Sequence, residues 1–332
     1  MSGIRALRKI QLGRELTAGT EANATAIWRG QGTMEDQQEV VFPEEDVGYL
    51  SGVDRSYIPK VLAAITFDET PATFEQLPYL LAAGIENIVS GSADGAGSGY
   101  IYQYDLPTTS ANSIQSYTIE AGDNEQEEQC LYGFVERIHL AGAAGEAVMM
   151  EADWLGRQVA TGSYTAALSL PTVEEILFGK GKLYIDPAGS IGSTQKSNTF
   201  LEFALDIQTG WVPVFTGDGN LYWTFNKNVG PEVTLDVTFE HETTSIAEKA
   251  AWRAETARAI RMLWEGSELA TAGTTYTYKT LNIDLMGKWE SFEKIDERDG
   301  NDIVTGTLRG RYNSTEDLFG QIIVVNALSA LT

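Results

Sequence analysis

Apolar and polar residues alternate along many short stretches of this chain. The alternation is complete over 148–154, 233–239 and 281–285, where every second side chain is apolar. This period-two pattern is typical of a strand with one buried and one exposed face. Further strands are predicted where β-branched and aromatic residues cluster, at 40–42, 101–104, 117–120, 133–140, 182–185, 200–207, 221–225 and 321–325. The sequence therefore predicts a mainly β protein.

Two stretches have helical periodicity instead. A long helix is predicted at 246–265, because Ser245 and Glu248 have the spacing of a capping box and Gly266 follows as a stop signal. One stripe at helical spacing supports it: Trp252, Thr256, Ile260 and Leu263. The basic residues of this segment fall off the stripe and face either solvent or an acidic neighbour. A shorter helix is predicted at 74–83, although Pro78 argues against one unbroken helix there.

A turn and an internal repeat indicate how the strands are organised. Asp299-Gly300 is a tight-turn signal between 292–295 and 303–308, and it predicts a β-hairpin. The order of strands and turns over 117–154 recurs over 205–239, as a duplicated unit would. We therefore predict an N-terminal arm at 1–25 and two related domains at 26–170 and 171–332. Each domain is expected to be a β-sandwich or barrel with a flanking helix.

The net charge excludes several classes of partner. The chain has 47 acidic and 23 basic residues, a formal net charge of −24, and residues 61–136 contain no lysine or arginine. A field of this sign repels nucleic acid, anionic membranes and phosphate-rich ligands. The N-terminus differs, because five of the first 30 residues are basic: Arg5, Arg8, Lys9, Arg14 and Arg29. This stretch is either a solvated tail or an arm that docks on the acidic body of a neighbouring copy.

Residues typical of catalytic or metal sites are sparse. There are two histidines, His139 and His241, and one cysteine, Cys130, so no intrachain disulfide can form. The sequence contains no zinc-protease, serine-hydrolase, phosphate-loop or paired-cysteine motif. We therefore expect no enzyme, cofactor or metal, with hydrolysis by paired carboxylates as an alternative because acids are abundant. No secretory signal and no run of about 18 apolar residues is present, so we expect no membrane association.

Several short segments also occur in a characteristic order. In the first half they are 10–20 (Ile-Gln-Leu-Gly-Arg-Glu-Leu-Thr-Ala-Gly-Thr), 24–30, 42–48 and 73–81. In the second half they are 261–266 (Arg-Met-Leu-Trp-Glu-Gly), the strand at 278–285 and the turn at 297–304. This order spans most of the chain, and it resembles the tail tube proteins of long-tailed, non-contractile bacteriophages.

The resemblance implies a structural virion protein, made in the host cytoplasm and assembled into the phage tail. Such subunits are β-sandwiches or barrels that stack as rings into a hollow tube. The rings are commonly six-fold, so a chain with two tube-type domains would form trimeric, pseudo-hexameric rings, with hexameric rings as the alternative. The implied partners are further copies of the chain, the tape measure, tail terminator and distal tail proteins, and DNA that passes without specific binding. The alternative is a β-sandwich binding module, such as a capsid decoration or adhesion protein.

Three groups of residues have expected roles in such a tube. Candidates for lining the lumen are Glu151, Asp153 and Asp236, because a basic lumen would hold DNA; the alternative is an outward, solvated sheet face. Candidates for joining successive rings are Arg5, Arg8, Lys9 and Arg14 in the arm, and Asp123, Glu125, Glu127 and Glu128 in an acidic loop. The Gly/Ser-rich loop at 90–99 is a further connector candidate. We expect deletion of residues 1–14 to leave a folded subunit that no longer stacks.

Overall fold

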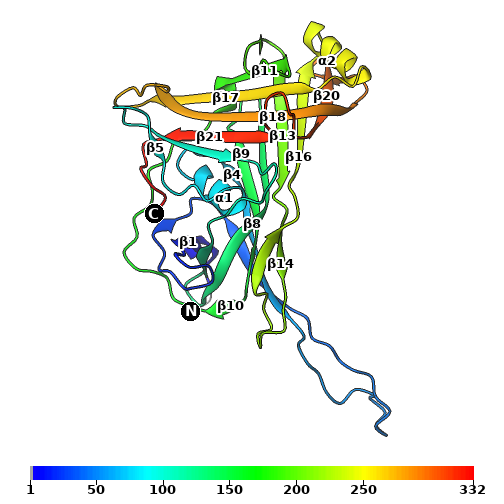
Figure 1. Ribbon diagram of the computed structural model, residues 1–332. Helices are drawn as coiled ribbons and strands as arrows, with labels where there is room; N and C mark the ends of the chain where they lie inside the picture. Colours follow the sequence, from blue (N-terminus) through cyan, green and yellow to red (C-terminus); the bar gives the residue numbers. More distant parts are fainter. Residues whose placement is uncertain (1–2) are drawn as a thin grey trace.

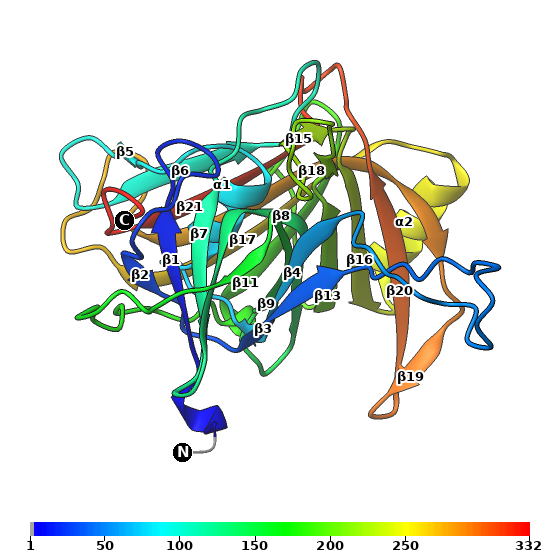
Figure 2. The same cartoon turned by 90° about the horizontal axis from the view of Figure 1, so that it is seen from below.

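The computed structural model describes residues 3–332 and confirms the mainly β class (Figures 1 and 2). The strands before residue 170 are β1 (Lys9–Arg14), β2 (Ala26–Ile27), β3 (Gly32–Gln38), β4 (Val61–Pro71), β5 (Ser92–Ala93), β6 (Tyr100–Asp105), β7 (Tyr117–Gly122), β8 (Glu127–Ala143), β9 (Met149–Gly156) and β10 (Val159–Thr161). The later strands are β11 (Gly181–Pro187), β12 (Gln195–Lys196), β13 (Phe200–Gln208), β14 (Trp211–Val214), β15 (Phe225–Asn228), β16 (Glu232–Glu240), β17 (Arg258–Glu268), β18 (Tyr278–Phe292), β19 (Asp296–Arg298), β20 (Asn301–Gly310) and β21 (Gly320–Asn326). The α-helices are α1 (Leu77–Gly84) and α2 (Thr243–Arg253), and two 3₁₀ turns cover Arg5–Leu7 and Phe178–Lys180.

One antiparallel ladder joins the two halves of the chain. Its strands follow the order β3–β4–β9–β8–β13–β16–β20. Strands β8 and β13 pair across residue 170, with Leu140 opposite Leu205. The main hydrophobic core also draws on both halves, as Trp154 and Ile283 show. The domains predicted at 26–170 and 171–332 therefore share one sheet and one core, with α1 in the first range and α2 in the second.

A second set of strands crosses the first in Figure 1, in the order β11–β17–β18–β21–β6. Strand β18 connects the two sets, because its C-terminal part pairs with β20. Helix α1 lies between them, contacts β8 and β6, and has every residue buried. Two sheets that cross in this way enclose the apolar faces of both. The fully buried aromatic rings of Tyr104, Trp154 and Phe203 help to fill this core.

The N-terminal arm predicted at 1–25 is wrong from Lys9 onward. Strand β1 pairs with β7 along its whole length, from Lys9 opposite Gly122 to Arg14 opposite Tyr117. Ile10 is buried within it, as its alternation with polar neighbours allows. Among residues 3–25, the stretch before Lys9 and the loop after Arg14 lie outside the sheet, so the deletion of residues 1–14 considered above would remove a core strand.

The long helix predicted at 246–265 is also wrong in its second half. Helix α2 ends at Arg253, and Arg258 begins β17, which lies between β11 and β18. Residues 258–268 are rich in helix formers, but from Ile260 to Glu265 their buried positions alternate with the period of a strand. Pairing on both edges therefore outweighs local helix propensity. Gly266, the expected helix stop, lies inside this strand.

The predicted turn is confirmed, whereas the repeat is only partly matched. Asp299 and Gly300 have φ values of 55° and 81°, as a two-residue hairpin turn requires, and they join β19 to β20. The strand before the turn is 296–298 rather than 292–295. The strand predicted at 221–225 does not form in the main sheet, because the chain there leads into a separate hairpin of β14 and β15. Strand β13 instead pairs directly with β16, so the second copy of the repeat lacks its middle strand.

Candidate functional surfaces

The three candidate lumen residues lie on one face of the central ladder. Glu151 and Asp153 are on β9, and Asp236 is on β16. Glu151 is opposite His139 on β8, and Asp236 is opposite Ala204 on β13. Residues directly opposite each other, or two apart on one strand, share a face of a sheet. The alternate residues of these strands are buried in the core, so this polar face is the outer face of the ladder.

Arg137 on β8 is the cation at the centre of this face. Its Nε lies 2.6 Å from Asp206 Oδ2, and its Nη1 lies 3.3 Å from Glu151 Oε1 and 3.5 Å from Asp153 Oδ2. Burial lowers the pKa of Arg137, but the hydrogen bond and charge of Asp206 outweigh it, so the pKa is raised. The pKa of Glu136 is raised by burial and by the charge of Asp153. One cation thus offsets part of the charge of several carboxylates.

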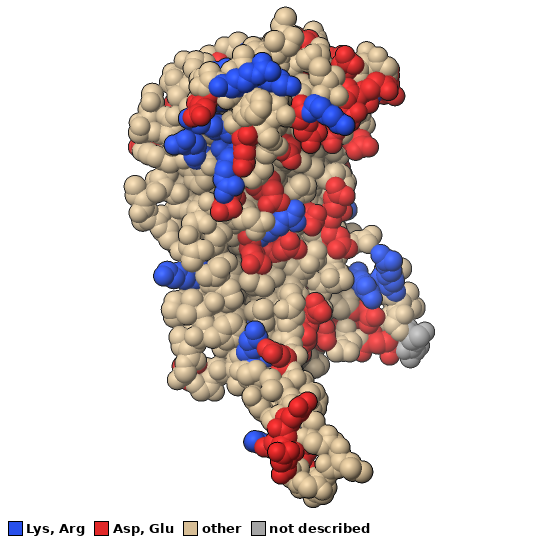
Figure 3. All heavy atoms as spheres, turned by 90° about the vertical axis from the view of Figure 1, so that its right-hand side faces the viewer, with Lys and Arg blue, Asp and Glu red and all other residues tan. Residues whose placement is uncertain are grey.

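We call Glu151, Asp153, Asp206 and Asp236 the acidic sheet face. Its four carboxylates exceed the single charge of Arg137, so the patch keeps a negative excess. In Figure 3, Asp and Glu run down one side of the molecule toward a projection at its lower end, with fewer Lys and Arg among them. A surface of this kind repels a polyanion that passes close to it.

The two groups of predicted ring connectors meet within one subunit. Arg5 is in the first 3₁₀ turn and Arg8 caps it, whereas Lys9 and Arg14 are the ends of β1. The backbone N–H of Ile4 donates to Asn124 Oδ1 at 2.8 Å, which holds this end of the chain against the acidic turn between β7 and β8.

The acids of that turn have local structural partners. The Oδ1 atom of Asp123 accepts hydrogen bonds from the backbone N–H groups of Glu125 and Gln126, and these lower the pKa of Asp123. Glu127 accepts from the Tyr164 backbone N–H, and Glu128 accepts from the Gln126 side chain. The acidic loop is therefore an ordered turn of β7–β8.

A groove of about 780 Å³ separates the N-terminal segment from the sheet. Its lining includes Arg5, Arg8 and Lys9 together with Asp68, Asp123 and Glu128. Among residues 3–332, none of the three cations forms an ion pair: Arg5 donates to Gln31, and Lys9 lies 3.9 Å from the centre of the Tyr164 ring. We call this hollow the N-terminal groove. The charge of Arg8 contributes to the lowered pKa of Asp123 across this groove.

The loop at 90–99 is anchored to its own subunit. Asp94 is buried, and its carboxylate accepts hydrogen bonds from the backbone N–H groups of Thr275 and Tyr276. Burial alone would raise the pKa of Asp94, but these bonds lower it. The backbone N–H of Thr271 donates to the Ser98 hydroxyl, and the backbone N–H of Ser98 donates to the Thr271 carbonyl. The loop therefore braces the turn between β17 and β18, and its expected role as a ring connector has no support from these contacts.

The most exposed feature is one that the sequence analysis missed. Residues 39–60 connect β3 to β4 and project from the body at the lower right of Figure 1. No residue from 35 to 60 is buried. The segment is held by its own contacts: Val41 pairs with Tyr57, the Glu45 backbone bonds to Gly52, and Arg55 contacts Glu45 at 2.7 Å. We call residues 39–60 the projecting hairpin.

The projecting hairpin exposes apolar side chains that a free loop would not need. Seven large ones are exposed: Val40, Phe42, Val47, Tyr49, Leu50, Val53 and Tyr57. Phe42 is 60% exposed and Tyr49 is 68% exposed. The available sequence signal was apolar residues without strand or helix periodicity, next to Gly48 and Gly52, whose positive φ values of 81° and 64° suit turns. Such a pattern indicates a loop whose apolar side chains contact another molecule.

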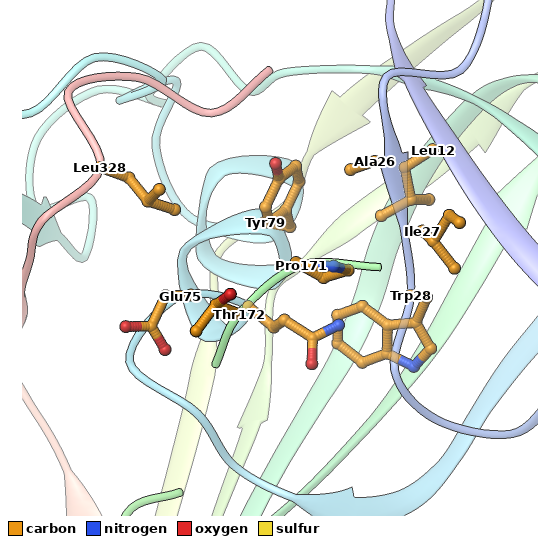
Figure 4. A pocket seen from close by; sticks show the side chains of 10 residues that line it. Leu12, Ala26, Ile27, Trp28, Glu75, Tyr79, Pro171, Thr172 and Leu328 are labelled. Carbon is orange, nitrogen blue, oxygen red and sulfur yellow. The ribbon is translucent and has the colours of Figure 1, made fainter. Parts of the chain in front are cut away.

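A smaller, mostly apolar pocket of about 310 Å³ lies beside α1 (Figure 4). In the figure, Leu12 and Trp28 from the N-terminal part face Tyr79 of α1, with Pro171 beside them. Gln76 also lines the pocket, and its side-chain Oε1 is buried without a hydrogen-bond partner. The pocket could accept an apolar side chain or a small apolar ligand that also hydrogen-bonds to an amide.

Two further observations concern residues 3–332 as a whole. Within them, no group of three or more His, Cys, Asp or Glu residues is arranged to hold a metal ion. Neither described helix is long and apolar enough to cross a membrane. In comparisons with known proteins, no family model matches the sequence, and no curated protein matches it either.

Proposed function

We propose that this chain is the subunit of a hollow tube, the tail tube of a long-tailed bacteriophage, which polymerises through contacts between copies and lets DNA pass. The projecting hairpin is the observation that carries the proposal. Fully burying a large apolar side chain stabilises a protein by about 1.5–3 kcal/mol. Burying the seven exposed side chains against a partner surface would therefore stabilise the contact by about 10 kcal/mol.

Three other features support a tube in particular. The ordered segments of the sequence resemble tail tube proteins, and the crossed β-sheets agree with the expected fold class. The acidic sheet face has a negative excess, and such a surface repels DNA. In this proposal the subunits belong to the virion, and the tape measure, tail terminator and distal tail proteins are the other partners.

Replacing the projecting hairpin tests the proposal. Gln38 and Val61 are opposite each other in the β3–β4 register, so an Asn-Gly turn can replace residues 39–60 and close the two strands. Because none of the replaced residues is buried, the variant should unfold at nearly the same temperature as the parent protein. We expect the parent to form tubes visible by negative-stain electron microscopy and the variant to remain unassembled. Tubes of normal length from the variant would contradict the proposal.

The pocket beside α1 supports a second candidate, a β-sandwich binding module. Trp28 lines the pocket, so a bound ligand should change tryptophan fluorescence. A screen of small apolar amides against the parent and a Tyr79→Ala variant would detect such binding. Saturable binding by a protein that never assembles would favour this candidate over the tube.

A further inference from the structure

We propose that the projecting hairpin of one copy binds the N-terminal groove of another copy, through alternating apolar and charged contacts. The inference rests on the proposed self-assembly and names the partner of the hairpin. It differs from the expectation that the basic N-terminus docks on an acidic body. The partner surface is instead one acidic hairpin.

The N-terminal side presents two adjacent stripes. A 3₁₀ helix has three residues per turn, so residues three apart lie on the same side of it. In the turn at Arg5–Leu7, this places Arg5 beside Arg8, and Ile4 beside Leu7. Ile4 is 47% exposed and Leu7 is 53% exposed. The segment therefore presents a basic stripe next to an apolar one, and neither has a full partner in its own subunit.

The hairpin presents the complementary pattern. Phe42 and Val47 are exposed apolar residues that flank an acidic run. Within that run Glu45 is already paired with Arg55, whereas Glu44 and Asp46 have no ion pair or side-chain hydrogen bond with any residue from 3 to 332. Glu44 and Asp46 of the hairpin can therefore contact Arg5 and Arg8 of another copy. The flanking Phe42 and Val47 can contact Ile4 and Leu7.

The charges of the two segments have opposite signs. Residues 39–60 contain five acids and two bases, and residues 3–9 contain three bases and no acid. The N-terminal groove also holds three acids, which keep their charge, so the basic excess is confined to residues 3–9. Asp123 and Glu128 are engaged in hydrogen bonds within their own turn, and only Asp68 has no described partner. Complementary charge of this kind steers association and sets the register of an interface.

The two surfaces cannot satisfy each other within one subunit. In both Figure 1 and Figure 2 the projecting hairpin and the blue segment that leads into β1 lie well apart. A contact that uses two different patches of the same chain is heterologous, so a linked pair of copies still has one free patch of each kind. Such contacts close into rings or extend into filaments. Growth of this type is what a tube subunit requires.

Charge exchange tests the pairing. The variants Arg5→Glu/Arg8→Glu and Glu44→Lys/Asp46→Lys should each raise the protein concentration needed for assembly by about tenfold or more, because like charges would then meet. Combining all four substitutions in one chain should restore assembly. The matched control is Lys294→Glu/Arg311→Glu, which changes the charge equally at two exposed bases outside both surfaces. It should assemble like the parent protein.

Cross-linking gives an independent test. Leu7→Cys and Val47→Cys in one chain should form disulfide-linked multimers on mild oxidation, and either substitution alone should not. The natural Cys130 does not interfere, because it is buried and burial raises the pKa of its thiol to about 12.

The outcomes separate this inference from the proposed function. If the parent forms tubes but the four-residue exchange fails to restore assembly and no cross-link forms, the pairing is wrong and the tube proposal stands. A parent protein that stays monomeric at every concentration, without cross-links, overturns both.

Discussion

Single buried carboxylates explain why the basic N-terminus is part of the body. Glu15 follows β1, is buried, and accepts hydrogen bonds from the backbone N–H groups of Gly19 and Tyr132 and from the hydroxyls of Ser116 and Thr118. The sequence could not reveal this role, because an acid among basic and small residues has no local pattern that distinguishes a buried site from a solvated one. Three of its four donors, Ser116, Thr118 and Tyr132, lie more than 100 residues away along the chain.

Glu15→Gln should destabilise the protein by about 2 kcal/mol, since bonds to a charged acceptor contribute about 1.5–3 kcal/mol each and the amide replaces only some of them. Urea unfolding followed by tryptophan fluorescence measures the change in free energy of unfolding. Glu21→Gln, at an exposed position of the same segment, is the matched control and should change it by less than about 0.5 kcal/mol. Equal effects of the two substitutions would show that Glu15 has no special role.

Glu242 provides a prediction that depends on pH. It caps α2, three residues before the residue that the sequence suggested, and hydrogen bonds from Thr244 and Thr243 outweigh burial and lower its pKa from 4.5 to about 2. A lowered pKa means that its contribution is complete above pH 4.5 and is lost as the pH falls toward 2. At pH 7, Glu242→Ala should therefore lower the free energy of unfolding by about 1 kcal/mol, and the variant should unfold at a lower temperature than the parent.

The difference between the two proteins should shrink as the pH falls from 4.5 to 2. Thermal unfolding followed by circular dichroism across this range checks it. A difference that stays constant with pH would show that the charge of Glu242 does not contribute.

At the scale of elements, local patterns predicted the type of most strands but not their partners. Alternation identified β9 and β16, whose apolar face is buried, and also the first part of β18, although Asn282 and Asp284 on its polar face are buried as well. The sequence predicted a helix over the first part of β17 because this segment is rich in helix formers. Its strand conformation depends on pairing with β11 and β18, which the local sequence does not show. The repeat misled for a similar reason, since two amphipathic strands look alike whether or not their ladders match.

Two truncations separate the N-terminal segment from the N-terminal strand. Deleting residues 1–8 leaves β1 in place and should preserve the unfolding temperature while reducing assembly. Deleting residues 1–14 removes β1 with its buried Ile10 and Leu12, and should cost several kcal/mol by loss of burial. Circular dichroism and sedimentation measure the two properties. A protein without residues 1–14 that folds as well as the parent would show that β1 does not belong to the core.

At the scale of the whole molecule, charge is the property that the sequence predicted best. The value of −24 needs no structure, and the structure adds where the charge lies: on an outer sheet face and on a projecting hairpin. The joining of both halves through β8 and β13 could not be predicted, because those strands pair residues more than 60 positions apart. The sequence suggested the candidate lumen residues one strand at a time, and the ladder of β9, β8, β13 and β16 is what brings them to one outer face.

Reversing the acidic sheet face tests its role in an assembled tube. Glu151→Lys/Asp153→Lys/Asp236→Lys should make assembled protein retain DNA, with an affinity that falls steeply as salt rises. If the face lines the lumen, the retained DNA should resist nuclease. The control Glu268→Lys/Glu290→Lys/Glu293→Lys places the same charge at other exposed positions and should leave any bound DNA open to digestion. Equal digestion in both proteins would place the acidic sheet face on the outside.

Electron microscopy of the concentrated, purified parent protein tests the central claim most directly. The account predicts hollow tubes of stacked rings, in which each projecting hairpin is covered by a neighbouring copy. Dispersed single subunits at all concentrations, with the hairpin still accessible to protease, would contradict it.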